Sequence, residues 1–187
     1  MDMQDRRVKR TQNLLAKALI ALSLEKGYEA VTIRDITERA DIGYATFFRH
    51  YHDKDALLHD VLDVVLTELM ALLLPSSAGG DPTVLGTLIF SYVQDHEEII
   101  RVLVGSRGSS SLLHHMIETG TQSILSQNAP QEDSPVPPEI AAYHWISATI
   151  NMIQWWLEYD MPYSPTHMGI IYHELIARPT RSVAFSS

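Results

Sequence analysis

Residues Thr32 to Tyr51 limit the possible folds more than any other stretch, because they indicate two short helices joined by a tight turn. Thr32 is placed to N-cap the first helix, and Asp35, three residues later, completes a reciprocal capping box. Residues 40–43 (Ala-Asp-Ile-Gly) are too turn-like to continue that helix, so a second helix is expected from about Gly43 to His50. This order predicts a helix-turn-helix, whose second helix can lie in a DNA major groove.

The same stretch resembles the DNA-binding motif of TetR-family regulators. That motif runs Thr-Ile-Arg-Asp-Ile-Ala, a turn, Thr-Phe-Tyr-Arg-His-Phe and then Lys-Asp/Glu-x-Leu. This chain has TIRDIT followed by DIGYATFFRHYHDKDALL, with the same gaps. The resemblance implies an all-α protein with an N-terminal three-helix helix-turn-helix domain in residues 1–52. A helix over 53–74 would link it to a C-terminal effector-binding and dimerisation domain in residues 53–187.

Two residues depart from the family pattern. Phe48 stands where many relatives have a tyrosine whose hydroxyl contacts a phosphate, and we expect His52 or Tyr51 to replace that hydrogen bond. Asp41 stands where glycine is usual, so the turn must rely on Gly43 or on the tolerance of aspartate for left-handed backbone geometry.

The base-reading residues are expected near the N-terminal end of the second helix, where outward side chains reach base edges. Gly43, Tyr44 and Thr46 lie there: glycine permits close approach, tyrosine offers a ring and a hydroxyl, and threonine offers a methyl and a hydroxyl. The alternative for each is an ordinary solvated helix face.

Other residues of the motif are expected to contact the DNA backbone. The resemblance implies that Thr32 and Arg34 meet phosphates or the groove wall, and that Arg49, His50 and Lys54 bind the backbone. Lys54 would also follow Asp53, a candidate N-cap, so that a helix N-terminus and an ammonium together form a phosphate clamp.

The charge of the chain is unevenly distributed. The net charge is −9, but residues 1–54 carry ten Lys/Arg against eight Asp/Glu, whereas residues 55–187 carry four against fifteen. Positive charge near one end suits a protein that meets phosphates only there. The cluster Arg6, Arg7, Lys9 and Arg10 is expected to contact phosphates or the minor groove; the alternative is a solvated helix start.

Periodic apolar positions predict helices along the whole chain and give no strand pattern. The fold class is therefore all-α, with about nine helices. Beyond residue 53 the predicted helices cover 53–74, 82–95, 96–104, 109–126, 138–159 and 165–177, with loops at 76–80 and 127–138 and a frayed end at 178–187. The apolar stretch Leu57 to Leu74 is interrupted by charged residues and is expected to be a buried helix, not a membrane span.

The last two helices are expected to form a four-helix bundle with a second copy of the chain. Ile146, Ile150, Ile153 and Leu157 fall on one helical stripe that could serve this homodimer. Small residues that permit close approach are Ala142, Thr149 and Gly169.

A pocket for a small-molecule effector needs apolar lining and a few polar groups. Core packing for the aromatic residues and ordinary hydrogen bonding for the histidines are the alternatives. Of Trp155 and Trp156, one is expected to line the pocket and the other to face the partner. The candidates are Tyr92, His96, His115, Met116, His144, Asn151, Met152, Trp155 and Tyr159.

No cofactor, metal site or catalytic residue is predicted. His114 with Glu118, and His59 with Asp63, supply only two ligands each, and no nucleophile elbow, phosphate loop or HExxH is present. The absence of cysteine excludes disulfides, and no signal peptide is visible, which suits the cytoplasm.

The predicted function is a DNA-binding transcriptional regulator, a homodimeric repressor released from a palindromic operator by a small-molecule effector. Two alternatives remain. The acidic C-terminal half could recruit a protein partner instead of a small molecule, or the chain could be an α-helical enzyme that uses its histidines as acid and base.

Overall fold

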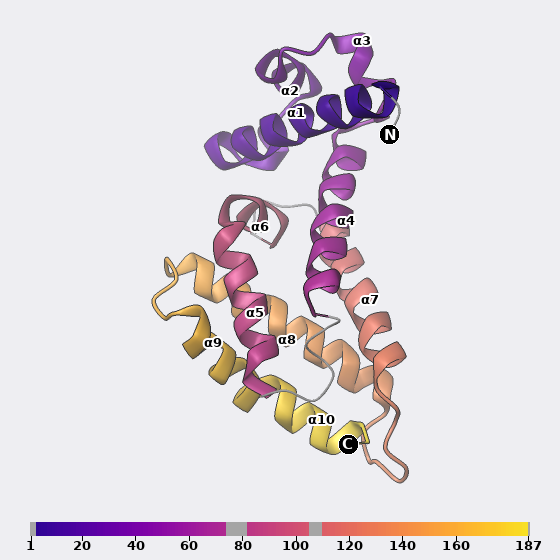
Figure 1. The fold of residues 1–187 in the computed structure, drawn as a ribbon, viewed down its shortest axis with the longest axis vertical. Coiled ribbons are helices and arrows are strands. Elements are labelled where there is room, and N and C mark those ends of the chain that lie inside the picture. The colour runs from indigo at the N-terminus through magenta and orange to yellow at the C-terminus, as the bar shows by residue number, and fades with distance from the viewer. Residues whose placement is uncertain (1–2, 74–81, 105–109, 187) are drawn as a thin grey trace. The chain divides into compact units, whose positions relative to one another are not determined.

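A computed structural model describes residues 3–73, 82–104 and 110–186. The chain divides into two compact units, Met1–Thr67 with Glu98–Leu112, and Glu68–Glu97 with Leu113–Ser187. Within the described residues, the helices are α1 (Met3–Lys26), α2 (Ile33–Ala40), α3 (Tyr44–Phe47), α4 (Lys54–Leu73), α5 (Pro82–Asp95), α6 (Glu97–Val104), α7 (Ser110–Gln127), α8 (Pro138–Glu158), α9 (Pro165–Tyr172) and α10 (Arg178–Ala184) (Figure 1).

The described part of the chain is all-α, as predicted. It contains no strand, only an isolated bridge between Pro130 and Phe185. Helices α9 and α10 are continuous through a π-helical turn, His173–Ala177, so the described residues form nine separate helices. No helix among the described ranges combines the length and apolar character that crossing a membrane requires. The predicted loop at 76–80 and the predicted end of α4 at Leu74 lie outside the described residues.

The first unit is built around a small core shared by α1, α2, α3 and the first half of α4. Leu19, Ile36, Phe47 and Leu58 are fully buried there. Gly27, at φ 81°, ends α1, because glycine adopts this left-handed backbone without steric cost. The division between the units falls within α4, at Thr67. The predicted functional boundary between residues 52 and 53 stays a prediction.

The second helix of the motif is shorter than predicted. Helix α3 covers only Tyr44–Phe47, whereas the sequence predicted a helix to about His50. The amides of Arg49 and His50 bond to carbonyls three residues back, on Thr46 and Phe47, so the chain tightens into a turn after Phe47.

In the second unit, α5 and α9 cross where two glycines meet. A Cβ on Gly86 would lie 2.8 Å from the Cα of Gly169, and a Cβ on Gly169 would lie 2.5 Å from Oγ1 of Thr87. The two backbones therefore touch at a distance that only glycine allows. The indole rings of Trp145 and Trp156 on α8 are fully buried in the same unit.

The prediction of a frayed C-terminus is wrong. Residues 178–184 form α10, and Phe185 is 2% exposed. The amide of Gln131 donates to the carbonyl of Ala184 at 3.0 Å, and the amide of Ser186 donates to the carbonyl of Ala129 at 3.0 Å. Residues 184–186 are thus fixed to the loop that precedes α8.

Candidate nucleic-acid interface

The start of α2 is fixed by the predicted capping box. The Thr32 hydroxyl accepts a hydrogen bond from the Asp35 amide at 3.2 Å, and the Thr32 amide donates to the Asp35 carboxylate at 2.8 Å. Lys26, the last residue of α1, pairs with the same carboxylate at 2.8 Å. The ammonium of Lys26 and the two donors of Thr32 hold the pKa of Asp35 well below its ordinary value. This cap joins α2 to the end of α1.

The turn between α2 and α3 depends on Asp41. It takes a left-handed conformation, with φ 54° and ψ 42°, at the C-cap of α2, while Gly43 has an ordinary φ of −60°. Of the two ways in which the sequence could form this turn, the structure uses the tolerance of aspartate for left-handed geometry. Gly43 acts instead as the N-cap of α3 and leaves space around its backbone.

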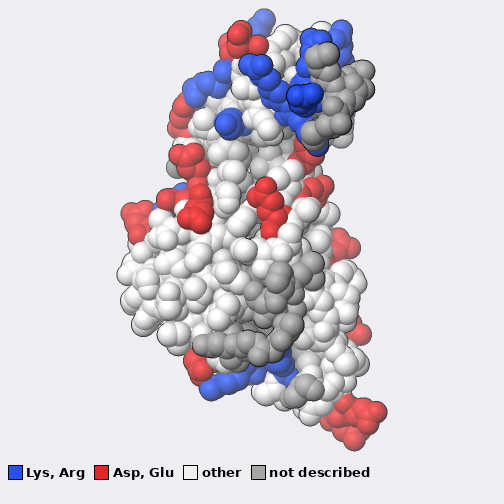
Figure 2. Space-filling model, viewed as in Figure 1, with Lys and Arg blue, Asp and Glu red and all other residues white. Residues whose placement is uncertain are grey.

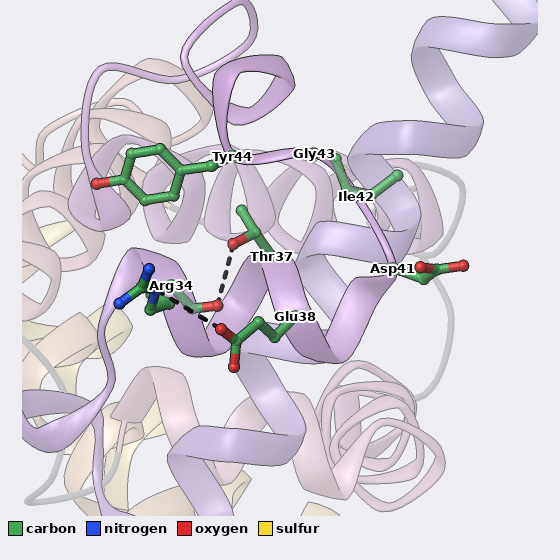
Figure 3. A pocket seen from close by; sticks show the side chains of 7 residues that line it. All are labelled: Arg34, Thr37, Glu38, Asp41, Ile42, Gly43 and Tyr44. Atoms are coloured by element: carbon green, nitrogen blue, oxygen red, sulfur yellow. Dashed lines mark hydrogen bonds and ion pairs between the residues drawn. The ribbon is translucent and has the colours of Figure 1, made fainter.

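A shallow hollow of about 730 Å³ lies between α2 and the start of α3 (Figure 3). Arg34 stands on one of its walls and forms an ion pair with Glu38 at 3.6 Å. Both side chains are more than 70% exposed, at 83% and 72%, so water screens this pair strongly. The residues that line the hollow are Arg34, Thr37, Glu38, Asp41, Ile42, Gly43 and Tyr44.

Helix α3 presents an exposed face of the kind that base reading requires. Gly43, Tyr44 and Arg49 are exposed, whereas Thr46 and His50 are half-buried. The side chain anchoring this segment is Phe47, which is fully buried. The resemblance placed Phe48 near DNA, but the sequence did not predict that its ring would pack on Tyr44 within this exposed face. Its ring is 47% exposed and lies 5.3 Å from that of Tyr44, and only its i, i+4 spacing from Tyr44 could have indicated this.

Lys54 has an internal role that the sequence did not predict. Its ammonium donates to the backbone carbonyls of Tyr28, Glu29 and Val31 at 2.9, 3.3 and 3.1 Å. It also lies 4.4 Å from the centre of the Tyr28 ring. An ammonium has three N–H donors, and here three carbonyls accept from it. A phosphate contact by Lys54, which stays a prediction, would have to displace one of these bonds.

Tyr51 does not supply the phosphate hydrogen bond that Phe48 lacks. Its side chain is 7% exposed, and its hydroxyl donates to Asp60 within α4. Burial first, and then the carboxylate of Asp60, raise the pKa of Tyr51. His52 remains the candidate, with 83% of its side chain exposed beside Asp53.

Several basic side chains of the first unit are paired with acids, and others face solvent. Lys26 forms an ion pair with Asp35, and Arg39 forms a bidentate ion pair with Glu25, with N···O distances of 2.8 and 2.9 Å. Figure 2 shows Lys and Arg side chains gathered on this unit. Those on the first turns of α1 are exposed: Arg6, Arg7, Lys9 and Arg10.

The structure does not gather the predicted effector residues into one group. The rings of Tyr92 on α5 and His96 just after it lie 4.3 Å apart, and the Tyr92 hydroxyl donates to Glu68 at 2.9 Å. A second set is half-buried on α7 and α8: His115, Met116 and Met152. The remaining four lie exposed along α8: His144, Asn151, Trp155 and Tyr159.

The two adjacent tryptophans of α8 point to different environments. Trp156 is fully buried and its indole N–H donates to the carbonyl of Tyr163 at 3.0 Å. Trp155 is 42% exposed, with its ring 5.2 Å from that of Tyr159 and 6.4 Å from that of Tyr163. These exposed rings form an aromatic row at the end of α8.

Three of the four residues in the predicted dimerisation stripe are buried within a single chain. Ile150, Ile153 and Leu157 are 7%, 8% and 3% exposed within a single chain, so they pack into the core of the second unit. Ile146, the fourth member, contacts the position where a Cβ on Gly120 would lie. Apolar side chains are exposed along α8, the loop after it and the final helix, which is α9 continued through the π-helical turn into α10; they include Ile140, Tyr143, Trp155, Tyr159, Tyr163, Ile170 and Leu175.

Acidic and histidine side chains do not cluster around a metal-sized site in the described ranges. Within them, no group of three or more His, Cys, Asp or Glu is arranged to hold an ion.

Comparison with known proteins identifies both parts of the chain. Residues 15–61 match the family model of bacterial regulatory proteins of the tetR family, and residues 86–178 match that of a transcriptional regulator C-terminal region. The HTH-type transcriptional regulator YxbF of Bacillus subtilis is 30% identical over 113 residues, which are 60% of this chain and 27% of YxbF. The chain thus aligns with about a quarter of that relative's length.

Solved structures share the fold over nearly the whole chain. NalD, the secondary repressor of the MexAB-OprM multidrug efflux pump in Pseudomonas aeruginosa, has a TM-score of 0.67 and 17% identity, covering 97% of this chain and 98% of NalD. A complex of triclosan with SmeT, the efflux-pump repressor of Stenotrophomonas maltophilia, has a TM-score of 0.65 and 16% identity, covering 95% and 92%. With the capped α2, the exposed α3 and both family matches in place, this chain belongs to the TetR family of DNA-binding transcriptional regulators.

Proposed function

We propose that this protein is a homodimeric repressor that leaves a palindromic operator when a small molecule binds its second unit. The observation that carries the DNA-binding half is the exposed face of α3, seated on a buried Phe47 beside a capped α2. Side chains presented from such a short, fixed helix reach base edges in the major groove.

Residues at the start of α3 contact the bases, and residues on neighbouring segments contact the DNA backbone. Gly43 and Tyr44 meet the base edges, with Thr46 at their side. Arg34 and Arg49 are exposed and reach phosphates or the groove wall. The exposed cations at the start of α1 add phosphate contacts, which position the protein without reading sequence. Thr32 acts mainly through its cap, because its hydroxyl also donates to Asp35 at 2.6 Å.

A second copy of the chain covers the exposed apolar side chains of α8 and the final helix. Trp155, Tyr159 and Ile170 are 42%, 61% and 46% exposed in one chain. Exposing this apolar surface to water is unfavourable in free energy, and burial against a partner removes that exposure. A two-fold pair then places two α3 helices about 34–36 Å apart, one turn of DNA. Such a dimer requires a palindromic site.

Release from DNA follows from a shift between two dimer geometries. An effector that binds one geometry more tightly moves the population away from the spacing that fits DNA. Helix α4 is the proposed lever, because Lys54 and Asp55 fix its first turn to Tyr28 while the same helix runs on to Leu73. Tyr92, with its hydroxyl on Glu68 and its ring on His96, is the proposed polar end of the effector site.

Proteins that share this fold support the proposal. NalD and SmeT are named as repressors of efflux pumps, and SmeT has been crystallised with triclosan. The likeness to them is one of fold, and the effector of this chain is to be identified from its own second unit. We place the protein in the cytoplasm, where it meets DNA, and assign no catalytic role to any residue.

The test measures DNA binding first and then the effect of a bound small molecule on it. Duplexes selected from random DNA by the purified chain are expected to contain a palindrome, and two chains should bind each duplex. A small-molecule screen for thermal stabilisation should then yield a compound that lowers operator affinity. Selection of a palindrome, together with a protein co-regulator that binds the second unit and no stabilising compound, would instead support the recruitment alternative.

A further inference from the structure

An exposed apolar pair stands on the face that reads DNA. Tyr44 and Phe48 are 54% and 47% exposed, and their rings meet edge to face at 5.3 Å and 66°. Phe48 also packs edge to face on the buried Phe47 at 5.4 Å. The Phe48 ring is therefore held in one place by the core on one side and by Tyr44 on the other, with its remaining surface open.

A phenylalanine ring has no donor or acceptor, so it cannot bind a phosphate or the polar edge of a base. Its open surface gains free energy only by leaving water against another apolar group. The major-groove edges of the base pairs carry one such group, the C5-methyl of thymine.

Resting on the DNA binding proposed above, we propose that Phe48 is a specificity-determining residue that packs on the methyl group of a thymine in each half of the operator. Tyr44 supports the ring and leaves its own hydroxyl available for a polar base edge. Phe48 thus contacts an apolar group and Tyr44 a polar group on adjacent bases, and the two residues lie within four positions of each other in the chain.

The experiment removes one methyl group at a time from the DNA. Operator duplexes selected by the full chain are remade with deoxyuridine in place of thymidine at symmetric pairs of positions, which keeps every hydrogen-bonding group. At one pair, affinity is expected to fall about fourfold per methyl group and on the order of tenfold for both. 5-Bromodeoxyuridine, whose bromine is close to a methyl group in size, should restore it.

Variants of Phe48 connect that loss to this ring. Phe48→Ala should bind the thymine operator as weakly as the wild-type chain binds the uracil operator, and should no longer distinguish the two. Phe48→Leu keeps an apolar side chain and should retain most of the discrimination. Circular dichroism melts of both variants check that the half-exposed position tolerates the change.

Two outcomes overturn the proposal in different ways. If the chain selects a palindrome but no thymine pair shows a uracil loss that Phe48→Ala abolishes, Phe48 does not contact a thymine methyl, while the DNA-binding function stands. If Phe48→Ala weakens binding equally at thymine and uracil, the ring packs on the sugar instead. A chain that selects no duplex at all removes the proposed function itself.

Discussion

The ammonium of Lys54 donates to the carbonyl of Tyr28 at 2.9 Å and lies 4.4 Å from the centre of the same residue's ring. The Tyr28 hydroxyl in turn donates to Asp55, the neighbour of Lys54 on α4. Two consecutive residues of α4 thus hold the backbone and the side chain of one tyrosine. This arrangement joins the first turn of α4 to the segment between α1 and α2.

Replacing Lys54 with alanine should therefore act first on stability. Three carbonyls lose a charged donor, and we expect the free energy of unfolding to fall by roughly 1–3 kcal/mol. Urea titration followed by circular dichroism measures this. Lys17→Ala, an exposed lysine on α1, is the control and should change little. If Lys54→Ala leaves stability intact but flattens the salt dependence of DNA binding, the lysine is a phosphate contact after all.

The capping box predicts a stability that depends on acid pH. The pKa of Asp35 is lowered in the folded chain, so its ion pair with Lys26 and its bonds with Thr32 stabilise the fold at pH values above its unfolded pKa, near 3.8. That contribution is lost as pH falls below about 4. Asp35→Asn should be less stable than the wild-type chain at pH 7, and the difference should shrink toward pH 3. A difference independent of pH would mean that the carboxylate charge does not matter.

The crossing of α5 and α9 predicts a strong response to a single methyl group. In Gly169→Ala, the new Cβ would lie 2.5 Å from Thr87 Oγ1 and 2.6 Å from the Thr87 amide nitrogen, so the helices must separate. Thermal unfolding should show a loss of about 2 kcal/mol or more. Gly43→Ala is the matched control, because its Cβ would meet only Thr46 Oγ1, at 3.6 Å, and stability should be unchanged. Equal melting of both variants would contradict the close crossing.

The fixed C-terminus predicts that its last aromatic residue is structural. Phe185 is 2% exposed and lies 6.3 Å from the ring of Trp145. Phe185→Ala should cost about 3 kcal/mol, as for a large core residue. Val183→Ala, at a position 41% exposed, should be close to neutral. Hydrogen exchange of the amides of Gln131 and Ser186 should rise in Phe185→Ala and stay low in the control; rapid exchange in the wild-type chain would mean a free end.

Local features of this chain were readable from its sequence. The capping box joins residues three apart, and the turn at Asp41 depends on the backbone preference of a single residue. These interactions need no knowledge of distant contacts. The capping box was therefore predicted correctly, the left-handed Asp41 was one of the two predicted forms of the turn, and the second helix was predicted in the right place but too long.

Features set by tertiary contacts were not readable. Helix α8 carries apolar residues on two faces, so periodicity alone could not show that Ile150 and Ile153 face the core while Trp155 faces out. The carbonyls that Lys54 binds belong to residues 23 to 26 positions earlier in the chain. The anchor of Phe185 is likewise far away, at Pro130.

The central claim is that α3 reads bases from each of two chains, and operator discrimination measures it most directly. Fluorescence anisotropy should be recorded for the full chain against its selected duplex and a scrambled duplex of equal length, across a series of salt concentrations. The account predicts two chains per selected duplex, an affinity at least a thousandfold above that for the scrambled duplex, and loss of most of that ratio in Tyr44→Ala. A monomer that binds both duplexes equally, with or without Tyr44, would contradict it.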